Sequence, residues 1–129
     1  MPNITIEFIK EFIASNAIPF TATQPRMCIP IISRMCQKMS VDIRFDDIKV
    51  CDDLIIDGHH RYLSALIMNY ALYHIPTNAT SATNKIEWNL VEFDEKDWDT
   101  HAKIEYLNEL DAKFNNLEIE FVRQITSSK

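Results

Sequence analysis

Apolar residues recur along this chain at two spacings, which predicts that helices and strands are mixed. Apolar positions three and four residues apart predict helices over residues 4–14, 30–39, 60–73 and 98–114. The first of these segments also fits a strand, because Ile4, Ile6 and Phe8 alternate with polar neighbours. Both interpretations of residues 4–14 therefore remain open at this point.

Alternation of apolar and polar residues predicts strands over residues 41–50, 54–56, 86–93 and 117–125. Asp52-Asp53 is typical of a turn, so the first two of these strands should form a hairpin. We expect an α+β fold, with a small mixed sheet packed against helices. At 129 residues, the chain has the size of a single domain spanning 1–129.

The intervening segments carry weaker signals. Residues 17–25 should be a strand or an extended loop, and residues 77–84 a mobile polar loop. The tail, residues 126–129, should be frayed.

The helix over 98–114 should have Asp97 as its N-cap. Its inward positions are expected to be Ile104, Leu107, Leu110 and Phe114. Trp88 and Trp98 either pack in the core near this region or form an exposed partner surface.

The only glycine of the chain, Gly58, lies between a short apolar strand and a helical pattern. A glycine at such a point allows a positive φ or the close approach of a ligand. The N-terminus of the helix after it would present free backbone N–H groups to an anion, and His59, His60 and Arg61 would add positive charge. Asp57 is placed to hold a metal ion or accept a proton. The alternative is an ordinary solvated turn, and two adjacent histidines alone make a poor metal site.

The sequence Asp57-Gly58-His59-His60-Arg61-Tyr62 resembles the Gly-x-x-Arg phosphate-binding turn of the ParB/sulfiredoxin superfamily. Its Asp-Gly-His-His-Arg form is similar to that of the free-serine kinases in this superfamily. Upstream, Thr23-Gln24-Pro25-Arg26 resembles the box near the start of ParB N-terminal domains. The resemblance covers residues 18–93 and implies a ParB/sulfiredoxin-like fold. Residues 94–129 would be a C-terminal extension made of a helix and a strand.

The resemblance implies a small nucleotide- or phosphate-binding protein that carries out Mg²⁺-dependent phosphoryl transfer or nucleotide hydrolysis. Its ligand would be ATP, another nucleotide or a phosphorylated small molecule. Asp57 and His60 would be catalytic, and Asp57 would also bind the Mg²⁺. The residues implied to bind phosphate are Gly58, His59, His60, Arg61 and Arg26.

The kinase pattern also includes a second acid from upstream of the turn. The candidates are Glu7, Glu11, Asp46 and Asp47. The position of the sulfiredoxin cysteine is occupied by His59, so reduction of a sulfinic acid is not expected.

The charge of the chain favours a second function class. The net charge is −6, and residues 85–120 hold four Lys or Arg against eleven Asp or Glu. Such a segment repels DNA phosphates, so binding to duplex DNA is not expected. The alternative function is a non-catalytic acidic protein that neutralises a basic partner, as in toxin–immunity pairs, through residues 85–120.

The apolar stretches, the N-terminal residues and the cysteines indicate the cellular compartment of the protein. No apolar stretch approaches the roughly 20 residues that span a bilayer, and the early acids Glu7 and Glu11 do not fit a secretion signal. The three cysteines form no Cys-x-x-Cys pair, which favours reduced thiols. We therefore expect a cytoplasmic protein without a membrane partner.

Overall fold

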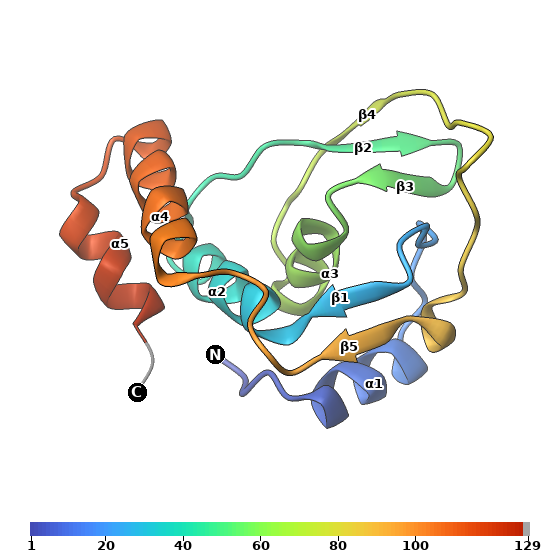
Figure 1. The fold of residues 1–129 in the computed structure, drawn as a ribbon, viewed down its shortest axis with the longest axis horizontal. Coiled ribbons are helices and arrows are strands. Elements are labelled where there is room, and N and C mark those ends of the chain that lie inside the picture. The colour runs from blue at the N-terminus through green and yellow to red at the C-terminus, as the bar shows by residue number, and fades with distance from the viewer. Residues whose placement is uncertain (128–129) are drawn as a thin grey trace.

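The computed structural model describes residues 1–127 and confirms the α+β class, with helices and short strands mixed along the chain (Figure 1). The elements are α1 (Ile6–Ser15), β1 (Arg26–Cys28), α2 (Ile29–Met39), β2 (Ile48–Cys51), β3 (Leu54–Asp57), α3 (His59–Met68), β4 (His74–Pro76), the 3₁₀ helix η1 (Trp88–Leu90), β5 (Glu92–Asp94), α4 (His101–Asn115) and α5 (Ile119–Thr126).

The strands form two small sheets. In the first, the order is β3-β2-β4, with β2 antiparallel to β3 and parallel to β4. In the second, β1 runs parallel to β5. The predicted hairpin is present as β2 and β3, and its second strand ends at Asp57. Its first strand is shorter than predicted, because residues 41–47 form a turn and an irregular segment before β2.

The main core lies between the sheets and the first three helices. The three helices and strands β2 and β3 each contribute a fully buried aliphatic side chain: Ile9, Ile32, Leu63, Ile48 and Ile55. A second, smaller cluster joins Ile43 to Ala112 of α4 and Val122 of α5. The α4–α5 pair therefore packs beside α2, at the opposite end of the molecule from the β2–β3 turn (Figure 1).

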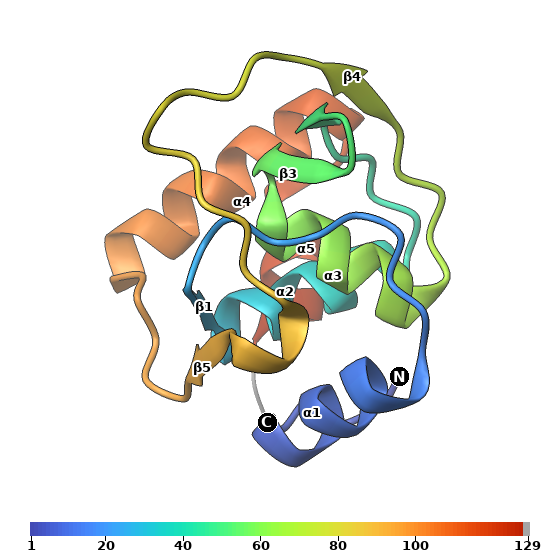
Figure 2. The same ribbon diagram turned by 90° about the vertical axis from the view of Figure 1, so that its right-hand side faces the viewer.

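The segment between α1 and β1 is extended and passes across α3 (Figure 2). The backbone N–H of Phe20 donates to the hydroxyl of Tyr62 (3.1 Å), and the Phe20 carbonyl accepts from the indole of Trp88 (2.8 Å). Thr21 also forms an isolated bridge with Leu54 of β3. These bonds fix the segment against the start of α3.

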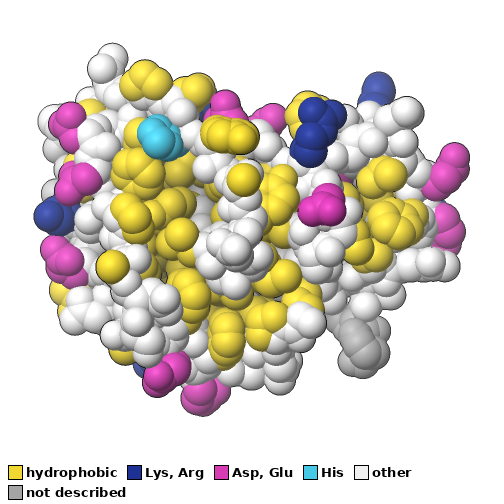
Figure 3. All heavy atoms as spheres, turned by 180° about the vertical axis from the view of Figure 1, so that it is seen from behind, with side chains coloured by type: hydrophobic (Ala, Val, Ile, Leu, Met, Phe, Trp, Pro, Cys, Tyr) yellow, Lys and Arg dark blue, Asp and Glu magenta, His cyan; other side chains and the backbone are white. Residues whose placement is uncertain are grey.

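Seen from behind, apolar side chains cover much of the middle of the molecular surface (Figure 3).

The strand predicted for residues 117–125 is wrong, because this segment is helix α5. Leu117, Ile119 and Phe121 do alternate, but Ile119, Val122 and Ile125 also fit a helical face. The helical face is the one that packs on the cluster of Ile43 and Ala112. Burial of this face therefore decided between the two patterns.

The strand predicted for residues 86–93 is also largely wrong. Ile86 forms one isolated bridge, Trp88–Leu90 is the 3₁₀ helix η1, and the strand β5 covers only Glu92–Asp94. Trp88 is buried and donates to Phe20, whereas Trp98 is 45% exposed and packs edge-on against the His60 ring. The core interpretation is thus confirmed for Trp88 but not for Trp98.

Two helix boundaries differ from the prediction. Helix α4 has Thr100 as its N-cap, with the hydroxyl accepting from the Lys103 N–H, because Asp97 is paired with Arg34 instead. Helix α3 ends at Met68, since Asn69 adopts a left-handed conformation (φ 52°) that closes the helix.

The inward face predicted for α4 is wrong at two positions. Leu110 is 44% exposed and Phe114 52% exposed, whereas Asn108 and Ala112 are buried. Helix α5 covers the Asn108 and Ala112 side of α4, which leaves the other apolar face uncovered.

The tail prediction is tested only in part. Thr126 ends α5 and donates its hydroxyl hydrogen to the Val122 carbonyl, so it is not frayed. Residues 128–129 lie outside the described residues. Among the helices of residues 1–127, none has the length and apolar character that a bilayer crossing requires.

Candidate functional site

Gly58 joins strand β3 to helix α3 in a left-handed conformation, with φ 102° and ψ 33°. This confirms the expectation that the only glycine of the chain has a positive φ. Within residues 1–127, no side chain caps the N-terminus of α3. The first turn of this ten-residue helix therefore directs its backbone N–H groups and the positive end of its dipole toward the turn.

The side chain of Arg61 folds back over Gly58. A Cβ atom at position 58 would lie 2.8 Å from Nη2 of Arg61 and 2.6 Å from Cγ2 of Ile48. Both approaches are shorter than real contacts allow. The glycine is thus favoured by its φ and by the close approach of Ile48, while the flexible guanidinium of Arg61 fills the remaining space.

We expect Gly58→Ala to lower the free energy of unfolding by about 1–2 kcal/mol. Alanine is strained at this φ, and its methyl group would displace Arg61 or Ile48. Chemical denaturation of the variant measures the loss. The control is Asn69→Gly, which places glycine at another left-handed position and should not destabilise. A variant with wild-type stability and an unmoved Arg61 would contradict this account of the turn.

Arg61 is held beside the turn with donors to spare. Its Nη2 lies 3.3 Å from Oδ2 of Asp57 and 3.3 Å from the carbonyl oxygen of Asp47. Its Nε is buried and has no hydrogen-bond partner within residues 1–127. Because Nε has almost no accessible surface, only the terminal Nη atoms of the guanidinium could reach a ligand.

His59 is buried and His60 is half-buried, and their rings hold the extended segment and strand β1 in place. Nε2 of His59 accepts from the backbone N–H of Thr23 (2.9 Å), and Nε2 of His60 accepts from that of Cys28 (2.9 Å). An Nε2 atom that accepts carries no proton, so each ring is neutral with its proton on Nδ1. Burial lowers the pKa of both histidines to about 4. Phosphate binding at this turn would therefore rest on the backbone and on Arg61, because neutral imidazoles supply no charge.

Arg26 lies on β1 with its guanidinium directed at two carboxylates of β5. It pairs with Glu92 (2.5 Å) and with Asp94, and this pairing lowers the pKa of Asp94. Of the box Thr23–Arg26, only Thr23 meets the turn, through His59 and through its hydroxyl bond to the Ile55 carbonyl (2.6 Å). The structure therefore brings the two motifs together without placing the Arg26 charge at the turn.

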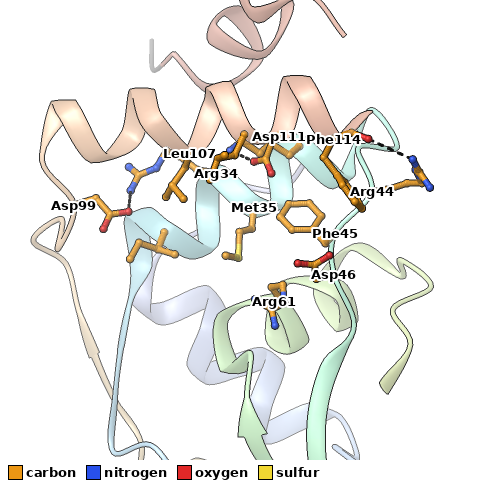
Figure 4. Close-up of a pocket in the computed structure, with 13 residues that line it drawn as sticks. Arg34, Met35, Arg44, Phe45, Asp46, Arg61, Asp99, Leu107, Asp111 and Phe114 are labelled. Carbon is orange, nitrogen blue, oxygen red and sulfur yellow. Dashed lines mark hydrogen bonds and ion pairs between the residues drawn. The ribbon is translucent and has the colours of Figure 1, made fainter. Parts of the chain in front are cut away.

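Of the four upstream acids considered, the structure brings the Asp46-Asp47 segment to Arg61. The Asp47 carbonyl accepts from Arg61, and Asp46 lines the same groove as Arg61 (Figure 4). Glu7 and Glu11 lie on α1, where Glu11 accepts from Ser15. The sequence offered no way to choose among them, because the choice depends on how the chain returns to α3.

The carboxylates near the turn bear on the Mg²⁺ prediction. Within residues 1–127, no group of three or more His, Cys, Asp or Glu side chains is arranged to hold a metal ion. Asp57 is nevertheless a largely exposed carboxylate beside Arg61. Mg²⁺ commonly binds through one or two carboxylates together with ligand phosphates and waters. The residues present fit that sparse arrangement.

A groove of about 410 Å³ opens beside the turn, between α2, α4 and residues 44–46 (Figure 4). Sequence reasoning missed it, since its walls come from segments far apart in the chain. Six apolar side chains line it: Ile31, Met35, Phe45, Leu107, Leu110 and Phe114. Seven charged side chains line it as well: Arg34, Lys38, Arg44, Arg61, Asp46, Asp99 and Asp111.

The acidic segment 85–120 is extensively paired with cations from the rest of the chain. Arg34 binds Asp97 (2.6 Å) and Asp99 (3.3 Å). The other pairs are Arg26 with Glu92 and Asp94, Lys38 with Asp111, and Arg123 with Glu105 and Glu120. These carboxylates stabilise the fold and present less unbalanced charge to a partner than the sequence indicates.

A comparison of the chain with protein-family models, curated proteins and solved structures finds no match.

Proposed function

We propose that this protein binds the phosphate of a nucleotide or another phosphorylated small molecule at the Gly58 turn, in the manner of the ParB/sulfiredoxin superfamily. The main support is the geometry of the turn. The Arg61 guanidinium folds over Gly58, which has a left-handed conformation and lies at a helix N-terminus that no side chain within residues 1–127 caps. Backbone N–H groups, a helix dipole and a cation then converge on one point. Each of these features favours a phosphate group.

The proposed chemistry is Mg²⁺-dependent phosphoryl transfer or nucleotide hydrolysis. Asp57 would hold the Mg²⁺, which would offset phosphate charge. Asp46 is the acid that lies best for assisting transfer, because it faces the groove together with Arg61. His60 would position the turn rather than move a proton, since its Nε2 is occupied by Cys28 and its Nδ1 holds the ring proton.

We expect Arg61→Gln to weaken phosphate binding by about tenfold to a hundredfold, because it removes a charged donor. The measurement is calorimetric titration of ATP, GTP, CTP, UTP and inorganic tripolyphosphate, each with MgCl₂. Release of inorganic phosphate from the tightest nucleotide tests turnover, which Asp57→Asn should abolish.

The matched control is Arg26→Gln, which removes an arginine that is committed to Glu92 and Asp94. It should leave phosphate affinity unchanged. If wild-type protein binds none of the five ligands, or if Arg61→Gln binds them as well as wild type does, the proposed function is wrong.

Neutralisation of a basic protein through residues 85–120 is the alternative proposal. It has less support because many carboxylates of that segment are already paired within the fold. Glu95, Glu109 and Glu118 carry no ion pair within residues 1–127, so they are the positions at which such a partner would be sought.

A further inference from the structure

The Gly58 turn and the groove beside it meet at Arg61. Arg61 belongs both to the Gly58 turn and to the groove lining. In Figure 4, Arg61 and Asp46 lie at the side of the groove formed by α3, and Leu107 and Phe114 at the side formed by α4. A ligand whose phosphate sits at the turn would therefore extend its remaining part into the groove.

Six of the thirteen side chains that line the groove are apolar. Phe114 is 52% exposed and Leu110 44% exposed, on the face of α4 that no other element covers. Phe45 and Met35 complete the wall from the other side. Exposed aromatic and aliphatic side chains gathered in a concave site are typical of a binding site for an apolar or aromatic group.

One cation of the groove, Arg44, has no carboxylate partner within residues 1–127 and could face an anion. Four cations and three carboxylates line the groove, in a chain whose net charge is −6. Arg34, Lys38 and Arg61 are paired with carboxylates, whereas Arg44 forms no ion pair within residues 1–127. Its guanidinium lies 5.1 Å from the Phe114 ring centroid, in a cation–π contact at the edge of the groove.

The size of the groove limits its occupant, in addition to the apolar lining and the charge. A volume of about 410 Å³ falls within the usual range for small-ligand sites. It suits one ring system with a short linker and is too small for a folded partner. The occupant that meets all three constraints is a planar ring joined to a phosphate.

We infer that the groove between α2 and α4 binds the aromatic base of a nucleotide, with Phe114 as the stacking residue and Arg61 as the junction to the phosphates. This inference rests on the proposed function. It adds a binding site for the base, which the Gly58 turn does not contact. It assigns a role to α4, which lies outside the region of sequence resemblance.

The test compares nucleotides with a phosphate ligand that has no base. Wild-type protein is titrated with ATP, GTP, CTP, UTP and inorganic tripolyphosphate, each with MgCl₂. We expect at least one nucleotide to bind about tenfold more tightly than tripolyphosphate, and Phe114→Ala to remove that advantage without changing the affinity for tripolyphosphate. Phe114→Tyr keeps an aromatic ring and should retain the advantage.

Phe121→Ala is the control for loss of an exposed aromatic residue, because Phe121 lies on α5 and does not line the groove. Thermal unfolding of each variant verifies that the fold is kept. If tripolyphosphate binds as tightly as every nucleotide, or if Phe114→Ala keeps the full preference, the base site is overturned while phosphate binding stands. If no ligand binds, both proposals fail.

Discussion

Lowering the pH from about 6.5 toward 4 is expected to destabilise this protein by about 3 kcal/mol for each of His59 and His60 taken alone. Burial lowers the pKa of His59 and His60 to about 4, whereas an unfolded histidine titrates near 6.5. Between these values, the unfolded chain binds more protons than the folded one. The contribution of the two histidines to the free energy of unfolding is therefore fully present above pH 6.5. It is lost as the pH drops from 6.5 toward 4.

Because the two rings are neighbours, their combined effect should be less than twice the single one. Urea denaturation at pH 7, 6, 5 and 4.5 measures the slope. His60→Gln keeps an acceptor for the Cys28 N–H but does not titrate, so its slope should be smaller. A flat profile for wild-type protein over this range would show that the rings are not buried as neutral acceptors.

Ion-paired carboxylates also make the stability depend on pH, but at lower pH than the histidines, so the two effects can be measured separately. Arg34 lowers the pKa of Asp97 and Arg123 lowers that of Glu105. A group whose pKa is lowered on folding stabilises the fold above its ordinary pKa, and this contribution is lost as the pH falls through the folded value. For these acids, the loss begins near their ordinary pKa values and continues as the pH falls below them.

The second large effect is expected at the ion pair between α2 and α4. Lys38 is a nearly buried lysine whose Nζ lies 2.5 Å from Oδ2 of Asp111, with 7% of its side chain exposed. Asp111→Ala would leave this ammonium group buried without its partner. We expect a loss of about 3 kcal/mol in the free energy of unfolding, measured by chemical denaturation.

The double variant Lys38→Met with Asp111→Leu replaces the pair by apolar groups of similar size, and it should recover most of the loss. Lys85 and Glu87 provide the matched surface pair, with 3.9 Å between Nζ and Oε2 and both side chains exposed. Glu87→Ala should change stability by less than about 1 kcal/mol. An Asp111→Ala variant as stable as Glu87→Ala would mean that Lys38 reaches solvent. Because the pair ties α4 to α2, its loss should also widen the groove and weaken nucleotide binding.

The sequence determined the turn because the relevant physics is local. A single glycine between an apolar strand and an apolar helical stripe predicts a positive φ at the start of α3, and Gly58 has it. The hairpin before it followed from Asp52-Asp53 between two apolar segments, and Asp52 does adopt a positive φ. Helix α2 was likewise predictable, from its apolar face and from a proline near its N-terminus.

The tertiary structure alone decided which way the side chains of the motif point. His59 and His60 follow the glycine as a phosphate-binding histidine would, yet their rings are turned inward to accept from Thr23 and Cys28. The donors lie 36 and 32 residues away along the chain, so no local pattern reveals them. Arg26 is a similar case, since its partners on β5 are set by sheet pairing.

The C-terminal third shows the same division. Leu117–Ile125 fits both a strand and a helix by spacing, and only packing against Ile43 and Ala112 selects the helix. That packing also turns Leu110 and Phe114 of α4 toward the groove instead of the core. The sequence by itself therefore determined the elements whose conformation depends on neighbouring residues, above all the Gly58 turn. The groove, the neutral state of the histidines and the pairing of the acidic segment depend on contacts between distant residues, because burial and charge compensation exist only once the chain has folded.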